Sequence, residues 1–396
     1  MKCKNKLLVS LLCISLILSS MSTLALAYAS TGNPTIDTLI DRIETTGLTV
    51  TVDDTNAADV VVQVSGSPDS VSKTLNLVIP VGVTVEWGSF YVGTIPSPLN
   101  GPLISFSGEG TFKVVEGAWI WNEGSGNAIN AAGAKVVVTG GGVVEATSGT
   151  AIYGTGLDTV VIVEDRGSVM NEATSNLHPV INMVNSKNVG DYNVIVDGGA
   201  VWAMAELHVG YAIQTYGNVL VKAGEVHSES SNGRAINLIG STSVANIYGG
   251  KVWADGDNGV AISTATTNSE AVANAGVNVY GGIVSATSNF AIHVTGTHSF
   301  VNVEGGVVSA TSANAIRADK AGSSVSISGG FVFAYGTGIT GTNNVIHIVG
   351  GGEPVIGGDA VVVAWDRAGN PGPFDEYEEE GLIVEPTDLA NSVVGL

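Results

Sequence analysis

Residues 277–296, VNVYGGIVSATSNFAIHVTG, decide the fold, because residues 301–322, VNVEGGVVSATSANAIRADKAG, have nearly the same sequence. In each copy, apolar side chains alternate with polar ones in three short runs, as Val277 and Val279 do in the first. Alternation with a period of two predicts three short strands per unit. A pair of glycines separates the first run from the second in both copies.

The repeat extends along most of the chain. Its phase is marked by the second position of each Gly-Gly-like pair, which falls at Ala118, Gly142, Gly167, Gly199, Gly224, Gly250, Gly282, Gly306, Gly330 and Gly352. Most marks are 24 to 26 residues apart, with two insertions that bring the spacing to 32. This period is too short for repeats of paired helices. We therefore expect the coils of a parallel β-solenoid, with glycine at a tight corner that needs a positive φ or excludes a side chain.

The pattern resembles the right-handed parallel β-helix of the pectate-lyase-like superfold, as found in bacterial secreted or cell-surface repeat proteins. The resemblance covers about residues 75–365 and lies in the repeat pattern, not in a catalytic motif. It implies an all-β, right-handed β-helix of about ten to twelve coils with three short strands each. A second column of corner asparagines, such as Asn258 and Asn289, fits either a hydrogen-bonded ladder or ordinary turns.

The chain divides into four segments. Residues 1–29 read as a signal peptide, with three lysines before an apolar stretch and cleavage after Ala27 or Ala29; an uncleaved membrane anchor is the alternative. Residues 30–74 form an N-terminal cap with a short amphipathic helix over residues 35–46. Residues 75–368 form the β-helix, and 369–396 an acidic Pro/Gly linker or the truncated start of a further module.

The formal charge of −21 becomes about −24 when the three signal lysines are removed. An acidic surface of this kind repels nucleic acid and anionic lipid. No segment after the signal peptide is long and apolar enough to enter a membrane. We expect a secreted or cell-surface protein, with polysaccharide or cell-envelope glycan as its partner.

One outward-facing column carries the candidate ligand-binding site. Three residues after the mark, Trp202, His227 and Trp253 fall on consecutive coils, with Glu225 and Lys251 beside them. Aromatic rings stack on sugar rings and carboxylates accept hydroxyl hydrogens, so the column predicts a polysaccharide-binding strip. The alternative is that the strip is covered by the insertions, or that its aromatic residues only stabilise cross-strand pairs.

Glu229 and Asp255 are the weak catalytic candidates, because they should lie on adjacent coils near the separation of a retaining glycosidase, roughly 5 Å. Neighbouring carboxylates are expected by chance in so acidic a chain. The aspartate-rich motifs and the arginine and lysine pair of β-helical pectin hydrolases are missing from the sequence. We therefore expect a non-catalytic structural or adhesive module. The alternative is a polysaccharide lyase or glycoside hydrolase with a groove between residues 173–186 and 264–275.

We expect no cofactor and no metal site. Residues 255–259, DGDNG, resemble the start of a calcium loop, but no glutamate follows at the distance that such a loop requires. A turn is the simpler interpretation.

Overall fold

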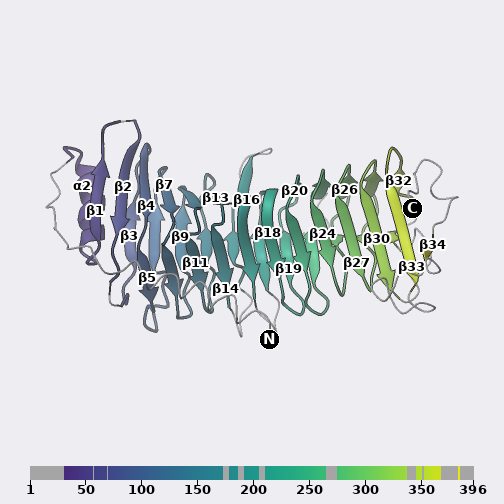
Figure 1. The fold of residues 1–396 in the computed structure, drawn as a ribbon, viewed down its shortest axis with the longest axis horizontal. Helices are drawn as coiled ribbons and strands as arrows, with labels where there is room; N and C mark the ends of the chain where they lie inside the picture. The colour runs from purple at the N-terminus through teal and green to yellow at the C-terminus, as the bar shows by residue number, and fades with distance from the viewer. Residues whose placement is uncertain are drawn as a thin grey trace.

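The computed structural model describes residues 31–366, except 57, 69, 173–177, 186–190, 205–209, 265–273, 337–344 and 350–351, and also residues 382–383. The proposed signal peptide and most of the acidic segment 369–396 lie outside these residues. Figure 1 shows a rod, with the helix α2 at one end and the strands β33 and β34 at the other. No helix in the described part of the chain is long and apolar enough to span a membrane.

The rod is a parallel β-solenoid of about ten turns, as the repeat predicted. Each coil contributes one strand to each of three ladders, and every strand pairs in parallel with its equivalents in neighbouring coils. We call them ladder 1, ladder 2 and sheet B.

Ladder 1 comprises β2 (Val60–Ser65), β4 (Val83–Trp87), β7 (Thr111–Val114), β10 (Lys135–Val138), β13 (Val160–Glu164), β20 (Val244–Ile247), β23 (Gly276–Val279), β26 (Phe300–Val303), β29 (Ser324–Ile327) and β32 (Val355–Ile356). Ladder 2 comprises β5 (Phe90–Gly93), β8 (Trp119–Asn122), β11 (Val143–Ala146), β14 (Ser168–Asn171), β21 (Lys251–Ala254), β24 (Ile283–Ala286), β27 (Val307–Thr311), β30 (Phe331–Gly336) and β33 (Val361–Asp366). Sheet B comprises β3 (Leu75–Val78), β6 (Ile104–Ser107), β9 (Ile129–Ala132), β12 (Ile152–Gly154), β15 (Ile181–Met183), β17 (Tyr211–Thr215), β19 (Arg234–Leu238), β22 (Val260–Thr264), β25 (Ile292–Val294), β28 (Ile316–Ala318) and β31 (Ile346–Ile348). Two long strands, β16 (Tyr192–Ala203) and β18 (Asn218–Ser228), run through the corner and belong to both ladders.

Valine fills the core position of ladder 2. For the eight marks from Gly142 to Gly330, the residue two positions later is a valine without solvent exposure: Val144, Val169, Val201, Val226, Val252, Val284, Val308 and Val332. Each such burial contributes about 1.5–3 kcal/mol. Because the same side chain recurs at the same depth, the valines of successive coils pair in register.

Glycine is required at the corner between ladders 1 and 2. Gly250, Gly282 and Gly306 have φ values of +73°, +74° and +74°. A Cβ atom on Gly282 would lie 2.6 Å from the carbonyl oxygen of Gly250 on the preceding coil. Both reasons predicted for the repeated glycine, positive φ and close approach, are therefore present.

The N-terminal end of the rod is capped. Helix α2 (Pro34–Glu44) begins at Asn33, whose side chain accepts a hydrogen bond from the backbone of Thr35. Its apolar face, Ile36, Leu39, Ile40 and Ile43, is buried. Strand β1 (Thr49–Asp53) then pairs antiparallel with β2. At the other end, β34 (Leu382–Ile383) pairs antiparallel with β33.

Asparagine side chains form a hydrogen-bonded ladder in the strands of ladder 1, and at the corner Asn289 Nδ2 donates to the backbone carbonyl oxygen of Asn258 on the preceding coil at 3.1 Å. Asn302 donates to Asn278 Oδ1 at 2.9 Å, Asn278 donates to Asn246 Oδ1 at 2.8 Å, and Asn246 donates to the hydroxyl of Tyr192 at 2.9 Å. At the corner, Asn258 has the left-handed φ of +60° expected for a turn. The strand asparagines occupy the same position in each repeat, whereas the distance from a corner asparagine to the next strand varies between coils.

Candidate functional site

The three aromatic residues of the predicted strip lie in register on consecutive coils. Trp202 on β16 pairs in register with His227 on β18, which pairs with Trp253 on β21. Glu225 on β18 and Lys251 on β21 are likewise paired in register. Side chains at these positions point away from the core because the intervening valines point into it.

The side chains of the strip pack closely on one another and do not leave the aromatic rings open for a sugar to stack on. The imidazole of His227 stacks on the indole of Trp253 with ring centroids 3.5 Å apart and planes 4° from parallel. The Nζ atom of Lys251 lies 3.5 Å from the same indole centroid. Two groups at that distance cannot share one face, so His227 covers one face of Trp253 and Lys251 the other.

The ring nitrogens of the strip are also engaged or buried. His227 is only 4% exposed although it points outward. The indole Nε1 atoms of Trp202 and Trp253 are buried and have no hydrogen-bond partner among the described residues. Neither the two faces of the Trp253 ring nor the two indole N–H groups are therefore open to a ligand in this conformation. Ligand binding by the strip stays a prediction, and sugar stacking on Trp253 would require Lys251 to move.

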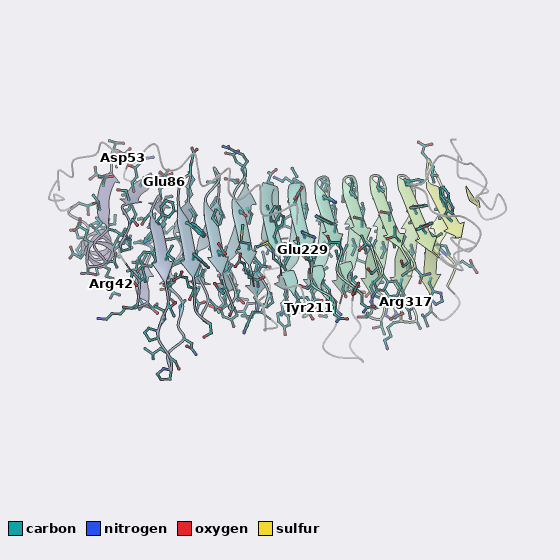
Figure 2. All side chains as sticks on the ribbon, turned by 60° about the horizontal axis from the view of Figure 1, so that its bottom comes forward. Arg42, Asp53, Glu86, Tyr211, Glu229 and Arg317 are labelled. Atoms are coloured by element: carbon teal, nitrogen blue, oxygen red, sulfur yellow. The ribbon has the colours of Figure 1, made fainter. Side chains whose placement is uncertain are left out.

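The two weak catalytic candidates hold the imidazole between them. Asp255 Oδ1 lies 2.8 Å from His227 Nε2, and Glu229 Oε1 lies 3.9 Å from His227 Nδ1. Both carboxylates are exposed on their outer side, and with Ser231 and Asp257 they line a shallow, open depression midway along the rod. Figure 2 places Glu229 in this middle region. Asp255 thus positions a buried histidine, which is a structural task that the sequence did not suggest.

The other expectations at this site concern metals and a groove. Among the described residues, no group of three or more histidine, cysteine, aspartate or glutamate side chains could hold a metal ion. Two insertions, residues 173–186 and 264–275, would flank the alternative enzymatic groove. Residues 173–177 and 186 of the first and 265–273 of the second lie outside the described residues.

A buried carboxyl group on the same column was missed. Glu145 on β11 is 5% exposed and accepts a hydrogen bond from Trp119 Nε1 at 3.0 Å. The ring of Trp119 stacks on that of Trp121 at 5.2 Å and 7°. Burial raises the pKa of Glu145 to about 7, and the negative charge of Glu172 adds to the rise, against the hydrogen bond from Trp119. The available signal was that Glu145 is the only carboxylate in the column of the strip.

A second polar cluster lies on sheet B. His293 Nε2 is 2.8 Å from Asp319 Oδ2, and Arg317 Nε donates to Asp319 Oδ1 at 2.6 Å. Burial lowers the pKa of His293 against the opposing effect of Asp319. Burial would raise the pKa of Asp319, but the hydrogen bonds from Arg317 and His293 outweigh it and hold that pKa below its ordinary value. Figure 2 shows Arg317 nearer the C-terminal end than Glu229.

Fold and strip together define a parallel β-solenoid protein with a packed aromatic column on its surface. No family model matches the chain, and no curated protein or solved structure shows significant similarity to it.

Proposed function

We propose that the protein is a secreted, non-catalytic rod of the cell exterior, which acts as a structural and adhesive module and holds polysaccharide along the strip. The observation that carries this proposal is the repeated stacking of the coils in ladder 2, with a valine core column and a glycine corner that recur from coil to coil. Such stacks are stiff because each coil is fixed by its two neighbours.

The proposed polysaccharide contact is made by carboxylates and not by ring faces. Glu225, Glu229 and Asp255 are exposed around the packed strip, and the depression that includes Ser231 and Asp257 is wide and shallow. Carboxylate oxygens accept hydrogen bonds from sugar hydroxyls. A long glycan that lies on this surface gains several weak contacts in a row, which suits adhesion. The negative charge favours a neutral glycan over an acidic one.

The test is a glycan array probed with residues 30–396, read beside a polysaccharide-degradation screen. We expect retention on neutral polysaccharide, and loss of it in the double variant Glu229→Gln and Asp255→Asn. Glu304→Gln, which removes an exposed carboxylate at another corner, is the matched control and should bind as the parent does. Equal retention by the double variant would contradict the proposed contact, and release of oligosaccharides would favour the enzymatic alternative.

A further inference from the structure

Two tyrosines lie side by side at the corner between ladders 1 and 2. Tyr248 follows β20 and Tyr280 follows β23, and each comes directly before the Gly-Gly pair of its coil. Strands β20 and β23 pair in register, and the backbone N–H of Tyr280 donates to the carbonyl oxygen of Ile247 at 2.8 Å. The two tyrosines therefore occupy equivalent positions on neighbouring coils. We call them the tyrosine pair.

The rings of the tyrosine pair are in contact and also open to solvent. They stack with centroids 4.5 Å apart and planes 20° from parallel. Tyr248 is nevertheless 54% exposed and Tyr280 36% exposed. Among the described residues, no other two tyrosine rings pack on each other, and Tyr216, which is 37% exposed, has no ring contact. The tyrosine pair thus combines close approach of two phenols with access for a reagent from solvent.

Stacked phenols at this distance are suited to oxidative coupling. Removal of one electron and one proton from a phenol gives a phenoxyl radical, whose unpaired spin lies on the oxygen and the ortho carbons. Two such radicals join through their ortho carbons, and each ortho hydrogen then moves to the phenolic oxygen of its own ring. The two tyrosines lose two electrons and two protons in total, and one hydrogen peroxide molecule takes them up to become two water molecules. Exposed side chains change rotamer within nanoseconds, so the ortho carbons of a stacked pair can meet.

The chain has no other means of forming a covalent link between coils once its first segment is removed. Its two cysteines, Cys3 and Cys13, both lie in residues 1–29, which read as a signal peptide. We infer that the tyrosine pair is a site of oxidative cross-linking, at which a peroxidase-type oxidant with hydrogen peroxide joins Tyr248 to Tyr280 and fastens two neighbouring coils. This inference uses the exterior location proposed above, where such oxidants act, but not the glycan contact.

The experiment is treatment of residues 30–396 with a haem peroxidase and hydrogen peroxide. We expect the blue fluorescence of dityrosine and a monomer whose intact mass has fallen by two hydrogen atoms. The yield per molecule should not change on about tenfold dilution, because a link within one molecule does not depend on protein concentration. Trypsin separates the two tyrosines, since it cleaves after Lys251 between them. Peptides 235–251 and 252–317 should therefore be recovered joined together.

Single substitutions identify the two partners. Tyr248→Phe and Tyr280→Phe should each lower the dityrosine fluorescence at least about 10-fold and abolish the joined peptides. Phenylalanine keeps a ring in the stack but has no phenol to oxidise, so the fold is preserved, and a circular dichroism melt checks this. Tyr216→Phe is the matched control, because it removes an equally exposed phenol outside the pair and should cross-link as the parent does.

Three results would overturn the inference: no dityrosine in the treated parent, links only between two copies of the chain on a denaturing gel, or joined peptides in both pair variants. The treated parent should also melt at a higher temperature than the untreated one, because a covalent link restricts the unfolded chain; equal melting would refute the fastening role. The double variant Glu229→Gln and Asp255→Asn should cross-link normally, so this inference and the proposed glycan contact fail separately.

Discussion

Replacing Glu145 with glutamine should make the protein more stable at alkaline pH and leave it nearly unchanged at acidic pH. The pKa of Glu145 is raised from its ordinary value of 4.5 to about 7 in the folded chain. A carboxyl group with a raised pKa binds its proton more tightly in the folded state than in the unfolded one. Its contribution to stability is therefore complete below about pH 4.5 and is lost as the pH rises through 7.

The expected size of the loss follows from the two pKa values. Their difference corresponds to about 3 kcal/mol between acidic and alkaline conditions. Glutamine cannot ionise, and its carbonyl oxygen can still accept the hydrogen bond that Trp119 Nε1 donates at 3.0 Å. Glu145→Gln should therefore gain up to about 3 kcal/mol over the parent at pH 9 and almost nothing at pH 4.

The assay is urea unfolding of parent and variant from pH 4 to 9, followed by tryptophan fluorescence, with the difference in unfolding free energy plotted against pH. Only this difference isolates Glu145, because every other titrating group is shared. Glu304→Gln, which removes an exposed carboxylate, is the control for the loss of one negative charge. A flat or falling curve for Glu145→Gln would show that the carboxyl group is not held in a protonated, buried state.

Three further substitutions test the packing. Trp253→Ala removes the ring held between His227 and Lys251 and should cost about 2 kcal/mol, measured by thermal unfolding; a change below half of that would mean the stack is not a coil-to-coil contact. Gly282→Ala should cost at least about 2 kcal/mol because of its positive φ and the nearby carbonyl oxygen, whereas Gly357→Ala, with nothing within 4 Å, should be tolerated; equal melting temperatures would argue against a strained corner. Asn278→Asp replaces the donated hydrogen with a charge facing Asn246 Oδ1 and should cost about 1 kcal/mol at pH 7, with recovery on acidification; no recovery would place the loss elsewhere.

The repeat predicted the backbone well because it constrains every coil in the same way. Val284 and Gly282 recur at fixed offsets, and a single consistent arrangement satisfies all copies. The same offsets predicted that Trp202, His227 and Trp253 would be in register. Burial of apolar side chains and a tight corner leave little freedom at these positions.

Side-chain packing on the outer face could not be predicted in the same way. Alternation told us that His227 and Glu145 point outward, and both do so, yet both are at most 5% exposed. Large neighbours cover them: the Trp253 ring in one case, and Trp119 in the other. Which rotamer a tryptophan adopts depends on the residues of adjacent coils, and a period of two carries no information about it.

The hydrogen bonds between coils have a mechanical consequence for a rod anchored at one end. In a parallel stack these bonds run along the long axis, so a pull on the two ends loads them one after another and not all together. The terminal coil would peel first, and a unit of 24 residues, such as the one from Gly282 to Gly306, would then add about 80 Å of extended chain. Stretching such a molecule should therefore lengthen it in steps, one turn at a time, at low force.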